Sequence, residues 1–364
     1  MNLFYDYTIA FIIALVVTVI ATPIVRMIAF KLNIVDLPSE NRKIHKKPMP
    51  YLGGVAIALG FFAGFIYLHP TVPAESTFST PAFIAGALII LFTGIIDDKY
   101  SLPPKYKFLM QILAAVVIVA SGLTIDFIQL PFFERIEFGW LAYPLSVLWI
   151  VGITNAINFI DGLDGLASGV SSIALGTMLV MGVLENQLLA VALSVILIGG
   201  TIGFLFFNFH PAKIFMGDSG AMFIGYTMAV ISITGLFKSL TIFSLILPII
   251  ILAIPIFDTS FAIVRRLLKG QKISTADRMH LHHCLMNLGF SHRTTVLIIY
   301  GISVVFGVSA IIFARSVLWG SLIILALCII MLRFTYELLS SWNKRKPLVD
   351  AVKKLTVQGQ KSKS

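Results

Sequence analysis

Charged residues are scarce in this chain: Asp, Glu, Lys and Arg make up only 12% of its 364 residues. Soluble globular proteins average about 25% charged residues, so the composition excludes an ordinary soluble fold. Cysteine is scarcer still, because Cys284 and Cys328 are the only two. One lies in a polar segment and the other in an apolar one, which excludes a disulfide framework and a cysteine-based metal site.

Long apolar stretches dominate what is present. The chain is 58% hydrophobic, and its mean hydropathy is +0.96. A transmembrane helix needs about 20 mostly apolar residues, and Pro, Gly and charged clusters divide the sequence into stretches of that size. We therefore predict an all-α polytopic membrane protein with about eleven transmembrane helices, at 5–28, 51–68, 81–97, 106–124, 141–158, 166–184, 187–207, 219–236, 240–263, 294–314 and 317–338.

The distribution of basic residues predicts the orientation, because Lys and Arg accumulate in cytoplasmic loops. With the N-terminus outside, the outer loops hold only Arg135, Lys238 and Arg315. We predict an N-out/C-in topology, with one integral membrane domain at 1–340 and a basic cytoplasmic tail at 341–364. This topology and anionic lipid head groups explain the net charge of +10, which argues against a nucleic-acid partner.

Acidic residues gather where apolar segments end. Asp97 and Asp98 close the third predicted span, Asp161 and Asp164 lie between the fifth and sixth, and Asp218 precedes the eighth. Ionised carboxylates at membrane depth are costly and are usually retained for ion, proton or phosphate chemistry. Adjacent carboxylates suit a divalent metal beside a general base or nucleophile. All of them fall on the predicted cytoplasmic side, so we expect the active site there.

Each acidic motif also has a purely structural interpretation. Asp97 and Asp98 could be the charges of a solvated loop, and Asp218 could be a helix N-cap. Asp258 fits an ion pair with Arg265 or Arg266 as well as it fits catalysis.

Two further segments carry polar groups that an apolar hairpin does not need. Asn155 to Ala167 contains two amides, Asn155 and Asn158, beside two carboxylates and two glycines. Such groups can hold sugar hydroxyls or a base edge, and glycine lets a ligand approach the backbone. Asn208 to Gly220 places Phe215 where it can stack on a nucleobase, close to an acid that can hold Mg²⁺ against phosphates.

A histidine cluster follows Arg278 in the large inner loop and consists of His280, His282 and His283. A structural zinc site is one interpretation, but no cysteine ligand or glutamate base accompanies the cluster. Together with the nearby arginines, the histidines fit better as cationic and neutral donors to a diphosphate.

These motifs, in this order, resemble the polyprenyl-phosphate N-acetylhexosamine-1-phosphate transferases. The resemblance runs from Gly53 and Gly54 to His283 and covers nearly the whole chain. The His-x-His-His pattern after Asp-Arg resembles the N-acetylglucosamine branch, and in particular the enzymes that begin wall teichoic acid synthesis. The translocase that handles MurNAc-pentapeptide usually has three consecutive histidines at this point.

The resemblance implies a reaction at the cytoplasmic leaflet. UDP-GlcNAc and undecaprenyl phosphate would give undecaprenyl-diphospho-GlcNAc and UMP, with Mg²⁺ or Mn²⁺ as the cofactor. By similarity, Asp218 and Asp98 are the expected metal ligands. The expected catalytic residues are Asp97, Asp98, Asp161 and Asp218, and the expected substrate-binding residues are Lys107, Asn155, Asn158, Asp164, Asn208, Phe215, Arg278, His280, His282 and His283.

Several alternatives remain at this point. The same chemistry on UDP-GalNAc or UDP-MurNAc-pentapeptide is the nearest one. A cation-coupled transporter also places carboxylates within spans, but near the middle of the membrane and in broken helices. The CDP-alcohol phosphotransferases are disfavoured because Asp164-Gly165-Leu166-Ala167 lacks the arginine of their motif. The sequence leaves open whether the protein forms a homodimer, and whether Asp97 or Asp98 attacks covalently or assists direct displacement.

Overall fold

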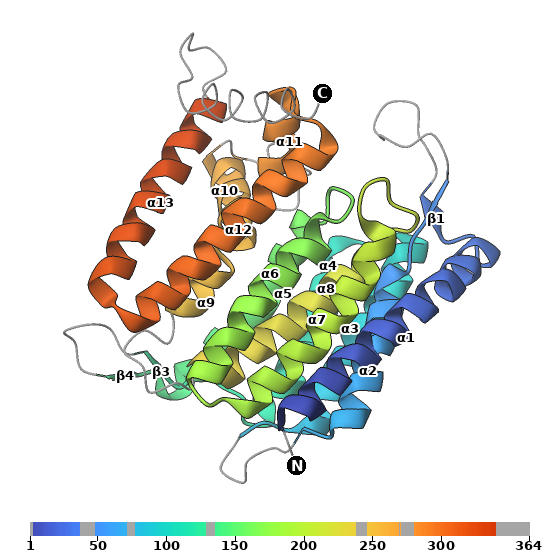
Figure 1. The fold of residues 1–364 in the computed structure, drawn as a ribbon, viewed down its shortest axis with the longest axis horizontal. Helices are drawn as coiled ribbons and strands as arrows, with labels where there is room; N and C mark the ends of the chain where they lie inside the picture. Colours follow the sequence, from blue (N-terminus) through green and yellow to red (C-terminus); the bar gives the residue numbers. More distant parts are fainter. Residues whose placement is uncertain are drawn as a thin grey trace.

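The computed structural model describes residues 3–36, 48–70, 77–128, 135–237, 246–268, 270 and 280–339. Most of these residues are helical, and Figure 1 shows the helices as a bundle. The helices are α1 (Leu3–Lys31), α2 (Gly53–Leu68), α3 (Thr80–Tyr100), α4 (Pro104–Ala120), α5 (Ala142–Ile160), α6 (Leu166–Leu184), α7 (Leu188–Asn208), α8 (Gly217–Ser232), α9 (Ile246–Ile251), α10 (Ala253–Leu268), α11 (Leu281–Asn287), α12 (His292–Arg315) and α13 (Val317–Leu339).

Strands are few among the described residues and form two short antiparallel pairs. β1 (Val35–Asp36) pairs with β2 (Met49–Pro50), in the register Val35 to Pro50. β3 (Phe127–Ile128) pairs with β4 (Ile136–Glu137), in the register Phe127 to Glu137. These pairs connect helices and form no layer of their own.

Six of the described helices are long and apolar enough to cross a membrane: α1, α3, α5 with the turn before it, α6, α7 and α12. The stretches Gly53–Leu68 and Leu318–Ile330 are apolar but shorter. The prediction of an all-α, multi-pass membrane protein is therefore confirmed. The total of eleven spans and the N-out/C-in orientation stay predictions, and the predicted tail at 341–364 lies outside the described residues.

The predicted ninth span, at 240–263, is not one continuous helix. Its described part consists of α9, which ends at Ile251, and α10, which begins at Ala253. Pro255 accounts for the break, because proline has no N–H to donate and its ring clashes with the carbonyl four residues earlier. α10 then runs on to Leu268 and includes Arg265 and Arg266, which the sequence assigned to a loop.

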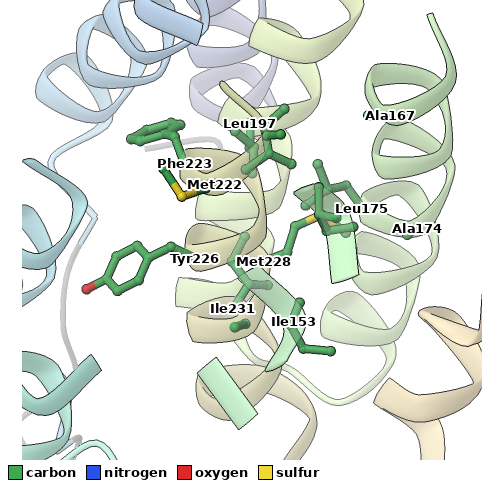
Figure 2. Packing of buried hydrophobic residues seen from close by; sticks show 14 of the residues in the cluster. Ile153, Ala167, Ala174, Leu175, Leu197, Met222, Phe223, Tyr226, Met228 and Ile231 are labelled. Carbon is green, nitrogen blue, oxygen red and sulfur yellow. The ribbon is translucent and has the colours of Figure 1, made fainter. Parts of the chain in front are cut away.

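The centre of the bundle is α8. All of its residues except Asp218 are buried, and it packs against α2, α3, α5, α6 and α7. Figure 2 shows Met222, Tyr226 and Met228 of this helix among side chains of the neighbouring helices. A helix that is apolar on every side is stable only when other helices surround it. The only charged residue of α8 is Asp218, which lies at its N-terminus.

Backbone contact between helices sets the position of that N-terminus. A Cβ added at Gly94 of α3 would lie 2.3 Å from the Cα of Ser219, and one at Gly54 of α2 would lie 2.0 Å from the backbone nitrogen of Gly220. Small residues let helix backbones approach this closely. The C-terminal end of α3, with Asp97 and Asp98, is thereby brought against the beginning of α8.

We predict that Gly94→Ala destabilises the protein by about 1–3 kcal/mol, because the added methyl group overpacks a backbone contact. Gly152→Ala is the matched control, since nothing lies within 4 Å of a Cβ added at Gly152 of α5. Thermal unfolding of the two variants in detergent measures the difference. Equal unfolding midpoints would contradict the prediction.

Candidate active site

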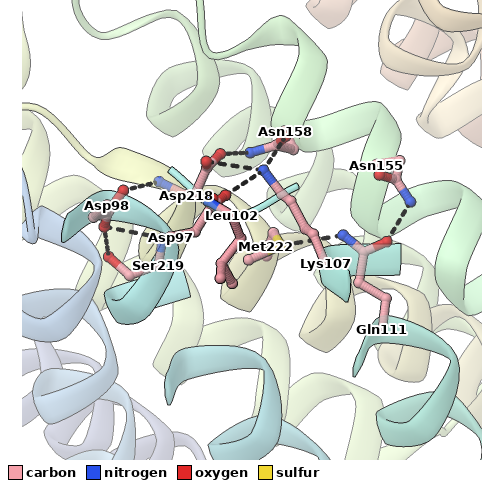
Figure 3. Close-up of polar contacts among 10 residues, drawn as sticks. All are labelled: Asp97, Asp98, Leu102, Lys107, Gln111, Asn155, Asn158, Asp218, Ser219 and Met222. Atoms are coloured by element: carbon pink, nitrogen blue, oxygen red, sulfur yellow. Dashed lines mark hydrogen bonds and ion pairs between the residues drawn. The ribbon is translucent and has the colours of Figure 1, made fainter. Parts of the chain in front are cut away.

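Three of the predicted site residues meet around the ammonium group of a fourth, Lys107, and the four come from four different helices (Figure 3). Lys107 of α4 places its Nζ 2.9 Å from Asp97 Oδ2 of α3 and 2.8 Å from Asp218 Oδ2 of α8. The same Nζ donates to Asn158 Oδ1 of α5 at 3.3 Å. Asn158 Nδ2 in turn donates to Asp218 Oδ1. Residues from four separate parts of the sequence thus form one polar cluster.

Asp98 lies behind this cluster and holds the N-terminus of α8. Its Oδ1 accepts from the backbone N–H of Asp218 at 2.7 Å, and its Oδ2 accepts from Ser219 Oγ at 2.7 Å. Helix N-termini favour negative charge because their first N–H groups have no partner within the helix. Gly217 has a φ of +72°, and a Cβ there would lie 2.6 Å from both Asp98 oxygens. Asp98 therefore fixes the direction in which Asp218 points.

The acids of the cluster differ in accessibility. Asp97 is 7% exposed, and its Oδ1 accepts from the backbone N–H of Leu102 at 2.7 Å. Asp218 is 33% exposed. A ligand approaching this cluster therefore reaches Asp218 first, while Asp97 is held within the protein.

Carboxyl groups outnumber ammonium groups in the described part of this region. Asp161 follows the end of α5, and its pKa is raised to about 8 by burial and by the nearby charges of Asp218, Asp98 and Asp164. Lys107 is the cation that pairs with the acids of the cluster. Mg²⁺ prefers oxygen ligands and commonly takes one or two carboxylates together with substrate phosphates. The set of oxygen donors therefore fits a divalent cation, whose charge would favour the ionised form of Asp161.

Asn155 lies one helical turn from Asn158 and faces a different partner. Its Nδ2 donates to Gln111 Oε1 at 2.6 Å, and Gln111 Nε2 lies 3.1 Å from Met222 Sδ. Gln111 is one turn beyond Lys107 on α4, so α4 and α5 are joined by two consecutive polar pairs. Asn155 thus contributes to the spacing of the helices that carry Lys107 and Asn158.

A cavity of about 380 Å³ adjoins the cluster. Its lining comes from the N-terminal segment, the loop after α5, the loop between α7 and α8, and the start of α12: Asp36, Met49, Tyr51, Asp161, Gly162, Leu163, Asp164, Asn208, His210, Pro211, Ala212, Phe215, Met216, Gly217 and His292. Gly217 belongs to the lining and also touches Asp98, so the cavity and the acidic cluster are contiguous. A pocket of this size suits a small ligand.

Phe215 forms part of the cavity wall and is held by the chain before α2. Its backbone N–H donates to Pro50 O at 2.9 Å, and its carbonyl accepts from Gly53 N–H at 3.0 Å. Its ring lies 5.8 Å from that of Tyr51, tilted by 49°. The aromatic wall predicted from Phe215 alone is therefore a pair of rings.

Asn208 and Asp164 shape the cavity in different ways. Asn208 is buried, its Oδ1 accepts from Gly165 N–H at 3.0 Å, and its Nδ2 donates to Ile214 O at 3.0 Å. Its amide is thus engaged in joining two loops. Asp164 Oδ2 accepts from His210 Nδ1 at 2.7 Å and from Ala212 N–H at 3.1 Å.

The histidine motif packs on the loop that contains Asp161. Asp258 Oδ1 accepts from the Leu281 N–H at 2.8 Å, and its Oδ2 lies 2.9 Å from His280 Nδ1. This arrangement gives the role of Asp258 that the sequence left open, which is to hold the start of α11. His282 is buried, and a Cβ on Gly162 would lie 2.4 Å from its Nε2.

Burial, together with the neighbouring His283, lowers the pKa of His282 to about 3. His282 is therefore neutral at physiological pH and is not one of the cationic donors that the sequence suggested. Its Nε2 is buried without a hydrogen-bond partner. Arg278, the arginine of the motif, lies outside the described residues.

Within the described ranges, a metal-ligand grouping occurs at a place that the sequence did not indicate. Suitable atoms of Asp164, His210 and His292 lie within 4.8 Å of one another. Sequence reasoning also missed Tyr51, Gln111 and Ser219. Gln111 could have been found from its helical spacing to Lys107, and Ser219 from its place after Asp218, but His292 has no comparable signal.

Comparison with known proteins identifies the family. A profile for glycosyl transferase family 4 matches residues 80–236. A probable undecaprenyl-phosphate N-acetylglucosaminyl 1-phosphate transferase of Bacillus subtilis is 50% identical over 349 residues, which cover 95% of this chain and 96% of the relative. The chain belongs to the polyprenyl-phosphate N-acetylhexosamine-1-phosphate transferases. The resemblance seen in the motifs is thereby confirmed.

Two further relatives share less identity with this chain. A decaprenyl-phosphate N-acetylglucosaminephosphotransferase of Mycobacterium tuberculosis is 37% identical, with 85% of each chain covered. A phospho-N-acetylmuramoyl-pentapeptide-transferase of Halalkalibacterium halodurans is 28% identical, with 83% of this chain and 94% of the relative covered. Identity is thus higher to the Bacillus subtilis and Mycobacterium tuberculosis N-acetylglucosamine transferases than to this pentapeptide transferase.

The raised pKa of Asp161 predicts a pH dependence of stability. An acid with a folded pKa of about 8 and an ordinary value of 3.8 binds its proton more tightly in the folded state, so it costs stability as pH rises through that interval. We expect the unfolding midpoint of EDTA-treated protein to fall from pH 5 to 8.5, and to fall less in Asp161→Asn. Glu137→Gln, which changes an exposed carboxylate of β4, is the control. Parallel profiles for wild type and Asp161→Asn would contradict this account.

Proposed function

We propose that this transferase moves GlcNAc-1-phosphate from UDP-GlcNAc to undecaprenyl phosphate, giving undecaprenyl-diphospho-GlcNAc and UMP. The observation that carries the proposal is the Lys107 ammonium between Asp97 and Asp218, beside a cavity of about 380 Å³. The similarity to N-acetylglucosaminyl 1-phosphate transferases over nearly the whole chain supports this choice of sugar. The product would be the lipid-linked sugar on which a cell-wall polymer such as teichoic acid is built.

The reaction brings two anionic phosphates together. An oxygen of the acceptor phosphate forms a bond to the β-phosphorus of UDP-GlcNAc, and the bond from that phosphorus to the oxygen bridging the two phosphates breaks. The leaving oxygen stays with UMP. Catalysis of such a step rests on alignment and on neutralising charge. Lys107 supplies a positive charge next to the exposed acid, which suits it to the acceptor phosphate.

A magnesium ion, or Mn²⁺ in its place, is part of the proposal. Asp218 is the acid best placed to hold it, because it is the exposed member of the cluster, and Asp161 adds a second carboxylate nearby. When bound, the ion would neutralise the charge of the donor diphosphate. The sequence also proposed Asp98 as a ligand. Because both Asp98 oxygens already accept hydrogen bonds from α8, we assign Asp98 the task of aligning Asp218.

Direct displacement is the mechanism we favour. A covalent mechanism needs a carboxylate oxygen that is free to attack. The Oδ1 of Asp97 accepts from Leu102 and its Oδ2 pairs with Lys107, while both oxygens of Asp98 are engaged by α8. The acceptor phosphate is already a nucleophile. Asp97 would therefore orient Lys107, and the lipid phosphate would attack directly.

The cavity is the proposed site of the donor nucleotide. Phe215 and Tyr51 offer aromatic faces on which a nucleobase can stack, and Asp164 offers an acceptor for its N–H. Asn208 would act by holding the cavity loops together. Asn158 and Asp161 would line the diphosphate and sugar region. His280, His282 and His283, with Arg278, would lie near the sugar.

We further propose that these groups face the cytoplasm in a bacterial plasma-membrane protein with eleven spans and an N-out/C-in topology. The site residues lie at helix ends, on α3, α4, α5 and α8. A transporter is expected to place its acids near the middle of the membrane instead. Anionic membrane lipid would attract the basic residues on the same side.

Purified protein with undecaprenyl phosphate and Mg²⁺ is expected to form lipid-linked sugar from radiolabelled UDP-GlcNAc, in preference to UDP-GalNAc or UDP-MurNAc-pentapeptide.

Asp218→Asn should lower the rate by on the order of a hundredfold or more, because it removes charge from the reacting centre. Sealed inside-out vesicles should use external UDP-GlcNAc, and right-side-out vesicles should not. Failure of all three donors to yield product would reject the proposed reaction.

We expect Lys107→Ala to raise the KM for undecaprenyl phosphate at least about tenfold, because a charge-assisted contact to the phosphate is lost. The KM for UDP-GlcNAc should rise less. Lys105→Ala is the matched control. Lys105 lies two residues before Lys107 in α4, but its ammonium lies over the ring of Tyr106. Steady-state kinetics with each substrate varied separately tests this. Equal effects on both substrates would contradict the assignment of Lys107 to the acceptor.

A further inference from the structure

The cavity contains a group of polar side chains that the transfer chemistry does not use. His210 comes from the loop between α7 and α8, and His292 is the first residue of α12. Both line the cavity together with Asp164. None of these residues belongs to the cluster around Lys107, so they have a task other than handling the reacting phosphates.

The His210 ring is fixed on two sides. Its Nδ1 lies 2.7 Å from Asp164 Oδ2, and because a carboxylate only accepts, this nitrogen carries the proton and donates. Its ring stacks on that of His292, with centroids 4.2 Å apart and planes at 22°. The backbone is held as well, because Arg293 Nε donates to the His210 carbonyl at 3.1 Å. The start of α12 thus locks this loop in place.

These contacts engage one oxygen of the Asp164 carboxylate in hydrogen bonds within the protein and leave the other oxygen available to a ligand. Oδ2 accepts hydrogen bonds from His210 Nδ1 and from the Ala212 N–H. Oδ1 has no hydrogen-bond partner among the residues that the structure describes, and the side chain is 15% exposed in the cavity wall. Such an oxygen accepts a hydrogen bond from a ligand N–H and repels a ligand acceptor.

We propose that His210 is a positioning residue for nucleobase recognition, orienting Asp164 so that its free oxygen accepts the ring N–H of the uracil of UDP-GlcNAc. This inference rests on the proposed function. His292 acts through its ring face, which stacks on His210, and both of its ring nitrogens are buried. Its partner in the cavity is therefore His210, not the ligand.

The alternative use of these side chains is a transition-metal site, since two histidines and a carboxylate with an open position form a known zinc arrangement. The stacked rings argue against it. A bound zinc ion requires a nitrogen of each ring to point at one centre, whereas the two rings lie face to face and His210 Nδ1 already donates to Asp164 Oδ2. The two interpretations make opposite predictions for His292→Phe, which keeps the ring face and removes both nitrogens.

Calorimetric binding of UMP and of pyrophosphate to the detergent-purified protein tests the proposal. His210→Phe keeps the stacking ring and removes the donor, so it should weaken UMP about tenfold while leaving pyrophosphate binding little changed. His210→Asn should restore UMP binding, because its amide can donate to Asp164. His292→Phe should bind UMP much as the wild type does. His69→Phe, outside the cavity, is the matched control.

Kinetics provide a second readout. In His210→Phe the KM for UDP-GlcNAc should rise about tenfold while kcat changes little, as expected when a uniform binding contact is lost. Unaltered UMP binding in His210→Phe would overturn the proposal, and so would an equal loss of UMP and pyrophosphate binding. Tight Zn²⁺ binding by EDTA-treated protein that disappears in both His210→Phe and His292→Phe would overturn it in favour of a metal site. A wild type that neither forms product nor binds UMP would instead reject the proposed function.

Discussion

The contact between Asp98 and the N-terminus of α8 is the interaction on which the rest of the site depends. It joins a carboxylate at the end of one helix to the unpaired N–H groups of another, an arrangement that is favourable for charge and for hydrogen bonding. Asp218 is directed towards Lys107 because its own backbone N–H is held. Gly217 lies next to Asp98 and also lines the cavity. The contact between Asp98 and α8 therefore also fixes the position of the cavity relative to the acidic cluster.

The sequence allowed the helices to be predicted well, and the physical reason is the lipid environment. Backbone groups in a bilayer must be paired within a segment, so apolar length alone locates the helices, as it does for α6, predicted at 166–184 and found at Leu166–Leu184. The ninth span was wrong as a single helix because apolar length does not register the break near Pro255. Contacts such as Gly94 with Ser219 depend on which helices are neighbours, and no periodicity reveals that.

The sequence predicted which residues belong to the site better than it predicted what each of them does. Asp97, Asp98 and Asp218 were expected together because all three fall on the predicted cytoplasmic side. Their division of labour follows from distances: one acid holds a helix, one holds a lysine and one is exposed. Likewise Asn208 was expected to bind a ligand through its amide, although the hydrogen bonds of that amide join two loops. A residue type indicates which chemistry is available, and only its surroundings indicate whether that chemistry is still free.

The cavity walls come from parts of the chain that are synthesised far apart in time. Tyr51 and the backbone at Pro50 support Phe215, while His292 closes the far side. The cavity therefore needs the segment before α2 as well as the loop before α8, and its lining is complete only once α12 is in place. A nascent chain that stops before α12 contains the full cluster around Lys107 but an unfinished nucleotide pocket. Under the proposed function, competence to bind the donor nucleotide thus depends on the part of the chain that is synthesised late.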